Sequence, residues 1–106
     1  MNEYKKQLDD LMTLVAKEKA SDLHLSVGRH PSLRISGELT ALVKHPVLTA
    51  SDTEGMVFSI ISPEEKEKFL KEKSLDFSYT YEDKARFRAN VFFQRGFVGA
   101  AFRLIP

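Results

Sequence analysis

Cysteine is absent from this 106-residue chain, and so are long apolar runs. Without cysteine the chain forms no disulfide, thiolate metal site or cysteine nucleophile, and the absence fits a reducing compartment. No apolar run approaches the roughly 20 residues that a membrane-spanning helix needs, and no apolar stretch of a signal peptide follows the charged N-terminus. The five glycines are scattered, so neither G-x-x-x-x-G-K-[ST] nor G-x-G-x-x-G occurs. The chain therefore has no phosphate-binding loop of its own.

Net charge is also small, because 16 basic side chains oppose 15 acidic ones for a formal total of +1. The signs are unevenly distributed: residues 77–106 carry five basic and two acidic side chains. All six arginines lie outside the predicted helices, whereas most lysines lie on them. Because a guanidinium offers a planar fork to phosphate or carboxylate, we expect the C-terminal strands to make fixed contacts with anions.

Apolar spacing predicts three helices. Residues 3–19 carry one apolar stripe at helical intervals. Residues 49–73 contain two capping boxes, Ser51–Glu54 and Ser62–Glu65, the second with a proline at the first helical position. We therefore expect two short helices in this segment.

Alternation with period two predicts the remaining elements as strands. These strands cover residues 22–27, 33–35, 39–43, 75–81, 85–94 and 97–104. The order is helix, two or three strands, two helices, three strands. This order predicts one α+β domain over residues 1–106, with an antiparallel sheet of five to six strands and helices packed to one side.

The predicted strand 85–94 carries the strongest candidate site. Arg86, Arg88 and Asn90 share one face, and the apolar residues between them share the other. Three polar side chains in a row need solvent, a ligand or another domain over them. The simpler alternative is a solvated face with salt bridges, for instance to Asp76.

The three histidines fall in separate elements, and no metal site is expected. His24 lies on the polar side of its strand without an acidic or cysteine partner at ligand spacing, so we expect a hydrogen-bonded structural residue. The oxygens of Ser21 and Asp22 are expected to accept from backbone N–H groups where the first helix gives way to the strand.

Five blocks of sequence carry a family resemblance. They are Ala20-Ser-Asp-Leu-His-Leu-Ser-Val-Gly28, Leu33-Arg-Ile-Ser-Gly-Glu-Leu39, Leu75-Asp-Phe-Ser-Tyr79, Ala85-Arg-Phe-Arg-Ala-Asn-Val-Phe-Phe-Gln-Arg-Gly96 and Ala101-Phe-Arg-Leu-Ile-Pro106. Together, in this order and spacing, they resemble the N-terminal part of type IV pilus retraction (twitching motility) ATPases of the PilT kind. That family lies within the type II/IV secretion ATPase superfamily.

The resemblance implies a PAS-like N-terminal domain. A C-terminal RecA-like ATPase domain, absent from this chain, would carry the Walker motifs and bind ATP and Mg. The full-length protein would be a cytoplasmic hexameric motor at the inner face of the cytoplasmic membrane, hydrolysing ATP to retract the pilus. Its partners would be its own ATPase domain, adjacent subunits and the pilus machinery, with no nucleic acid. This fragment alone would bind no cofactor and catalyse nothing.

The resemblance also implies roles for individual residues. Family N-terminal domains offer arginines towards nucleotide phosphates, and Arg86, Arg88 and Arg103 are the matching positions. By the same comparison, the candidates for the interface with neighbouring domains are Asn90, Arg95 and Arg34.

Two alternatives remain open from the residues. A stand-alone PAS-like small-ligand sensor would need a cavity among Leu23, Leu25, Phe77, Phe87 and Phe102. An RNA-binding module would use residues 95–102, which match four positions of the K/R-G-F/Y-G/A-F-V-x-F/Y signature. The second alternative predicts steeply salt-dependent binding of single strands.

Overall fold

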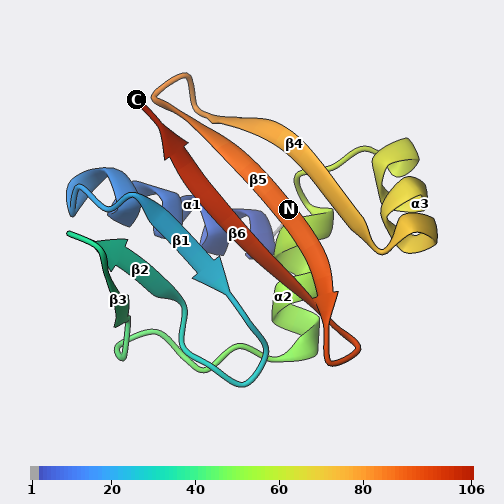
Figure 1. The fold of residues 1–106 in the computed structure, drawn as a ribbon, viewed down its shortest axis with the longest axis horizontal. Coiled ribbons are helices and arrows are strands. Elements are labelled where there is room, and N and C mark those ends of the chain that lie inside the picture. Colours follow the sequence, from blue (N-terminus) through green and yellow to red (C-terminus); the bar gives the residue numbers. More distant parts are fainter. Residues whose placement is uncertain (1–2) are drawn as a thin grey trace.

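The computed structural model describes residues 3–106 as three helices and one six-stranded antiparallel sheet (Figure 1). The helices are α1 (Glu3–Lys17), α2 (Ala50–Phe58) and α3 (Pro63–Glu72). The strands are β1 (Asp22–Leu25), β2 (Ser32–Ile35), β3 (Glu38–Ala41), β4 (Ser74–Tyr81), β5 (Ala85–Gln94) and β6 (Phe97–Ile105). The predicted α+β class and element order are confirmed.

The strands are arranged in the order β3-β2-β1-β6-β5-β4. β6, the last strand along the chain, lies in the middle of the sheet and pairs with both β1 and β5. Helices α1 and α2 lie behind the sheet in Figure 1, and the face turned towards the viewer carries no helix. We call this uncovered surface the open face.

The core lies between the sheet and helices α1 and α2. Phe87 and Phe102 point from neighbouring strands into it, and both are fully buried. The predicted apolar stripe of the first helix is confirmed, because Leu8, Met12 and Val15 are also fully buried. Burying such side chains contributes roughly 1.5–3 kcal/mol each relative to leaving them in water. Hydrophobic burial therefore fixes which face of the sheet the helices cover.

Helix α3 stands at the far edge of the molecule, next to β4 (Figure 1). Its buried anchor is Phe69, whose ring stacks on Phe93 with centroids 4.8 Å apart. Phe58 of α2 contacts the same ring edge-on at 6.3 Å. One aromatic cluster thus ties α2, α3 and β5 together.

The predicted capping box at the start of α3 is confirmed, whereas the one predicted for α2 is at the wrong residues. Ser62 accepts from the backbone N–H of Glu65, whose carboxylate accepts from the N–H of Ser62. For α2 the capping box is Thr49 with Asp52, so the predicted box Ser51–Glu54 is wrong. Both pairs fit the capping pattern, but backbone bonds between Leu48 and residues 28 and 29 hold the chain extended up to Thr49. The helix therefore begins two residues earlier.

Several other ends differ from the predicted ones. α1 stops at Lys17, because Lys19 takes a left-handed φ of 57° and Ala20 donates back to the Val15 carbonyl. β1 stops at Leu25, since Gly28 leaves the sheet to donate to Leu48. β3 stops at Ala41, although the N–H of the next residue, Leu42, still donates to the Pro31 carbonyl in the same register.

Two tight hairpins shape the ends of the sheet. Ser36-Gly37 joins β2 to β3, and Arg95-Gly96 joins β5 to β6, with positive φ at all four residues. Successive positive φ values define the type I′ turn, whose twist matches that of antiparallel strands. Gly37 and Gly96 adopt φ of 84° and 82° without a side-chain clash. Arg34 therefore lies two residues before one rigid turn, and Arg95 forms part of the other.

Candidate functional site

A row of charged side chains crosses the middle of the open face. The strand register pairs Arg34 with Asp22, Asp22 with Arg103, and Arg103 with Arg88. Directly paired side chains on one sheet face lie about 4.5–5.5 Å apart at Cβ. Four neighbouring strands thus place three arginines and one aspartate in a line, which we call the arginine row.

Asp22 and Arg103 form the central pair of the arginine row. Arg103 Nε donates to Asp22 Oδ2 at 3.2 Å, and Ser21 Oγ donates to Asp22 Oδ1 at 2.6 Å. The side chain of Asp22 is 6% exposed, whereas that of Arg103 is 72% exposed. Burial raises the pKa of Asp22. The hydrogen bonds from Ser21 and Arg103 together lower this pKa by more than burial raises it, so it lies below its ordinary value. The expected backbone N–H partners of Asp22 are therefore wrong, because side-chain donors occupy its oxygens.

Arg86 and Arg88 differ from Arg103 in having no partner. Both are exposed, and within residues 3–106 neither makes a side-chain hydrogen bond or an ion pair. Arg88 lines two shallow hollows of about 250 and 220 Å³, one shared with Ser78 and the other with Ala101. Because Ala101 is small, it leaves room beside Arg88 for an anionic group. The positive charge of both arginines is thus available to whatever covers the open face.

Asn90, which lies beside the row, and Arg34, which belongs to it, are already engaged in local contacts. Asn90 Nδ2 donates to Asp76 Oδ1 at 3.0 Å, so Asp76 forms no salt bridge to an arginine and the salt-bridge alternative fails at that residue. Arg34 Nη1 donates to the Gly37 carbonyl at 3.0 Å, which fixes the guanidinium over its own hairpin. Both side chains remain on the open face, which confirms the predicted face of Asn90.

His24 also lies on the open face, between its sheet neighbours Ser32 and Ala101. Its Nε2 is buried without a hydrogen-bond partner, which corrects the expectation of a hydrogen-bonded residue. Burial lowers the pKa of His24. The negative charge of Asp22 raises this pKa, the positive charges of Arg34 and Arg103 lower it, and the net shift is downward. The imidazole is therefore neutral near pH 7. Within residues 3–106, no three His, Asp or Glu side chains gather in a way that could hold a metal ion.

The segment that resembles an RNA-binding signature does not form a stacking platform. Phe97 is 45% exposed, whereas Phe102 is fully buried. Because Phe97 and Phe102 are five positions apart on one strand, with four residues between them, they point to opposite faces of the sheet. Two or three aromatic rings on one sheet face would be needed to stack successive bases.

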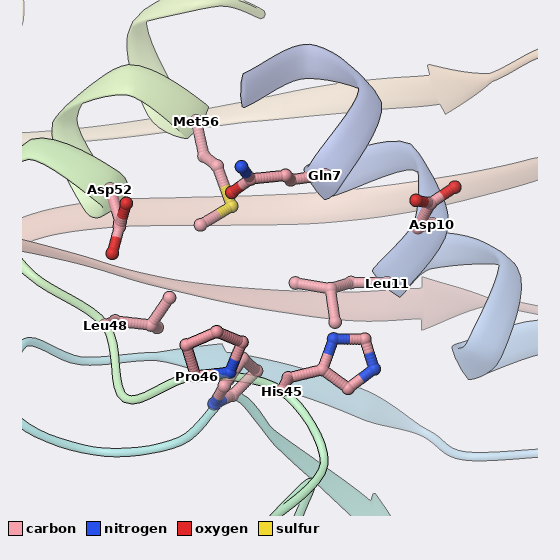
Figure 2. A pocket seen from close by; sticks show the side chains of 9 residues that line it. Gln7, Asp10, Leu11, His45, Pro46, Leu48, Asp52 and Met56 are labelled. Carbon is pink, nitrogen blue, oxygen red and sulfur yellow. The ribbon is translucent and has the colours of Figure 1, made fainter. Parts of the chain in front are cut away.

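A further cavity, which no residue pattern predicts, lies on the helix side of the sheet (Figure 2). It measures about 350 Å³ and opens between α1, α2 and the loop that precedes α2. The expected sensor cavity is different. Leu23, Leu25, Phe87 and Phe102 are fully buried and line none of the hollows described here, and Phe77, the fifth expected residue, lines only the shallow hollow beside Arg88 on the open face. Residues from four separate segments line the observed cavity, so no local sequence motif marks it.

Comparisons with known proteins relate the chain to pilus and secretion ATPases. It is 34% identical over 99 residues to the type IV pilus retraction ATPase PilT of Pseudomonas aeruginosa, covering 93% of this chain and 28% of that protein. It is 26% identical to the type IV pilus ATPase PilU of the same organism, covering 93% of this chain and 26% of PilU. No family model matches.

Solved structures agree. A crystal structure of the pilus retraction motor PilT with bound ADP superposes with a TM-score of 0.85 and 38% identity, covering 92% of this chain and 29% of that one. The ATPase DotB of Legionella pneumophila gives 0.79 at 20% identity over 96% of this chain and 29% of DotB, which shows the shared fold alone. The chain is thus homologous to the N-terminal regions of PilT and PilU and spans less than a third of their length.

Proposed function

We propose that this chain is the N-terminal, PAS-like domain of a hexameric pilus-retraction ATPase, which packs its open face against the ATPase domain of a neighbouring subunit. The homology to PilT supports the association with an ATPase. The observation that carries the packing is the six-stranded sheet with one face covered by helices and the other left bare and polar. In this assembly the chain acts as a regulatory and docking domain, and ATP and Mg are bound by the ATPase domain.

Within this proposal, the arginine row turns towards the nucleotide phosphates together with Arg86, which lies beside Arg88 on the same face of β5. Arg86 and Arg88 are the strongest candidates, because both guanidinium groups are exposed and unpaired within residues 3–106. Arg103 keeps its Nη groups for the same purpose while its Nε holds Asp22. A preorganised guanidinium stabilises the charge that develops on a transferring phosphoryl group. Asn90, Arg95 and Arg34 would border the interface.

The setting of this domain follows from the same proposal. The motor works in the cytoplasm beside the inner membrane, where the pilus machinery is its partner and nucleic acid is not. No helix within residues 3–106 has the length and apolar character to span a bilayer. The first check is the coding sequence beyond Pro106, where a Walker A motif is expected.

The decisive experiment substitutes the arginines in the full-length ATPase. Arg86→Ala and Arg88→Ala should each lower kcat for ATP hydrolysis at least about 10-fold, as loss of an electrostatic contact to a transition state does. Arg29→Ala, an exposed arginine outside the row, is the matched control. Analytical ultracentrifugation measures the hexamer in parallel.

The outcomes separate two roles of the open face. If Arg86→Ala, Arg88→Ala and Arg103→Ala all leave turnover unchanged in intact hexamers, the phosphate role is wrong. If turnover per hexamer survives but hexamers dissociate, the arginines serve the interface only.

A further inference from the structure

The cavity on the helix side has a preformed apolar floor. Leu11, Leu48 and Met56 line it and are 3%, 5% and 1% exposed. Figure 2 shows the three side chains converging on one empty space: Leu11 from α1, Leu48 from the loop before α2, and Met56 from α2. Its volume of about 350 Å³ falls within the range of roughly 300–1,000 Å³ found for small-molecule sites. This volume accepts an apolar body of the size of a single aromatic ring with a short tail.

Polar groups reach the cavity from opposite walls. The side chain of Gln7 lines the cavity from α1, and that of His45 lines it from the loop before α2 (Figure 2). Neither side chain makes a hydrogen bond to another part of residues 3–106, so both are free to bind a ligand. A few polar groups over an apolar floor are the usual composition of a binding pocket.

The charge around the cavity has one sign. Asp10 and Asp52 line it, and no lysine or arginine does. Asp52 Oδ2 accepts from the Thr49 backbone at 2.8 Å, which leaves its Oδ1 available. Asp10 contacts Lys6 at 3.3 Å, but this pair is largely exposed and therefore weak. The rim thus favours a cation.

The walls are held in place by hydrogen bonds that do not involve the cavity. His30 Nδ1 lies 2.7 Å from the His45 carbonyl, and Leu42 donates to the carbonyl of Pro31 at 2.8 Å. Leu48 donates to Arg29 at 2.9 Å. A ligand therefore meets a fixed loop rather than one that it must order, which reduces the entropic cost of binding.

We propose that this cavity binds a small amphiphilic amine, consisting of an ammonium group on an aromatic or branched aliphatic body. The body rests on Leu11, Leu48 and Met56, whose thioether makes favourable contacts with aromatic rings. The ammonium lies at the rim, within reach of the Asp52 carboxylate. Because the cavity is on the helix side and the arginine row is on the open face, this proposal holds whether or not the ATPase role is correct.

The test is an NMR titration of the 106-residue chain with three probes of matched size. 2-Phenylethylamine should bind with a Kd of about 0.1–1 mM, as expected for nine non-hydrogen atoms. Shifts should centre on Leu11, Leu48 and Met56. Neutral 2-phenylethanol should bind at least about 3-fold more weakly, and phenylacetate weakest of all, because the rim carboxylates repel it.

Two variants and a control locate the site. Asp52→Asn keeps an oxygen acceptor for the Thr49 cap but removes the charge, and should weaken amine binding about 3-fold to 10-fold. Glu54→Gln removes a charge from the same helix outside the cavity and should leave the affinity unchanged. Gln7→Trp, at an exposed position, should block the mouth without entering the core.

Three results would overturn the proposal. They are equal affinity for amine and alcohol, unchanged binding by Gln7→Trp, and no shifts with about 10 mM amine, at which even a weak site fills. A tripeptide Ac-Gly-Arg-Gly-NH2 is titrated alongside. If the peptide binds and the free amine does not, the cavity is a protein-docking site and the small-molecule assignment is wrong.

Discussion

Asp22 determines how much of the arginine row is available to a partner. Its carboxylate is nearly excluded from solvent and holds two donors, Ser21 and Arg103. A buried carboxylate without partners is costly, so Arg103 is needed for folding before it serves any contact outside the domain. Arg86 and Arg88 hold no buried group in place. The effects of substituting them on activity can therefore be separated from effects on stability.

Asp22→Asn should lower the free energy of unfolding at pH 7 by about 1–3 kcal/mol, because it removes the charge from two buried hydrogen bonds. The folded state lowers the pKa of Asp22 from its ordinary 3.8. Its contribution is therefore present above pH 3.8 and is lost as the pH falls through the folded-state pKa. Urea unfolding at pH 7 and pH 3 measures both effects, with exposed Glu67→Gln as the control. Equal losses for the two variants at pH 7 would contradict the buried pair.

His24 should make stability pH-dependent closer to neutrality. Folding lowers the pKa of His24 from 6.5. At a pH between the folded-state pKa and 6.5, the imidazole is therefore protonated in the unfolded chain and neutral in the folded one. Stability therefore falls as the pH drops below about 6.5, until the folded-state pKa is reached. His24→Gln should flatten the unfolding free energy between pH 5 and 7, the range in which an ordinary histidine titrates. His30→Gln is the comparison, and an identical slope in both variants would count against His24.

At the scale of single elements, the two short helices owe their start to polar caps. α2 and α3 span 9 and 10 residues, lengths at which isolated helices are marginal. Each has a complete capping box, which satisfies backbone N–H groups that the helix itself leaves free. The caps therefore position Asp52 at the cavity and Phe69 over the sheet.

Thr49→Ala should destabilise the chain by about 1 kcal/mol, within the range of about 0.5–2 kcal/mol for lost caps. Ser51→Ala, in the body of the same helix, should change stability by less than about 0.5 kcal/mol. Thermal unfolding by circular dichroism compares the two. The reverse ranking would restore the box that the sequence alone suggested.

That misplaced cap shows where sequence patterns stop. Thr49-x-x-Asp52 and Ser51-x-x-Glu54 overlap and satisfy the same capping rule. The rule alone therefore cannot decide between them, and the prediction took the wrong one. The choice depends on Leu48, which is anchored by backbone bonds to a loop about 20 residues earlier in the chain. In the strands, by contrast, period-two alternation placed Arg86, Arg88 and Asn90 on one face correctly, because that relation is local.

For the whole molecule, α3 depends on one aromatic side chain, Phe69, for its attachment to Phe93 and Phe58. Phe69 is fully buried and stacks on Phe93, whereas the rest of the helix is largely exposed. The helix thus behaves as a unit held by a single side chain. We expect α3 to unfold together with the aromatic cluster and not residue by residue.

Phe69→Ala should cost about 3–5 kcal/mol, the usual range for deleting a buried aromatic ring. Leu70→Ala, at the neighbouring exposed position, should cost less than about 1 kcal/mol. Urea unfolding gives both values, and hydrogen exchange shows whether α3 opens first. A loss below about 1 kcal/mol for Phe69→Ala would mean that α3 is held by other contacts.

The long-range part of the site could not be predicted from residue patterns alone. Asp22 and Arg103 lie 81 residues apart and meet only because β6 inserts between β1 and β5. Alternation gives the face of each side chain but not the neighbouring strand. The helix-side cavity was missed for a similar reason, since Gln7, His45 and Asp52 come from separate segments that no common period connects.

The central position of β6 also bears on the order of events during synthesis. The ribosome makes β1 to β3 first and β6 last, yet β6 is the only strand that joins the two halves of the described sheet. Until residues 97–105 emerge, β1 and β5 each expose an unpaired edge, and such edges invite pairing with other chains. A nascent chain stalled before β6 therefore exposes two strand edges, on β1 and β5, that the folded domain keeps paired.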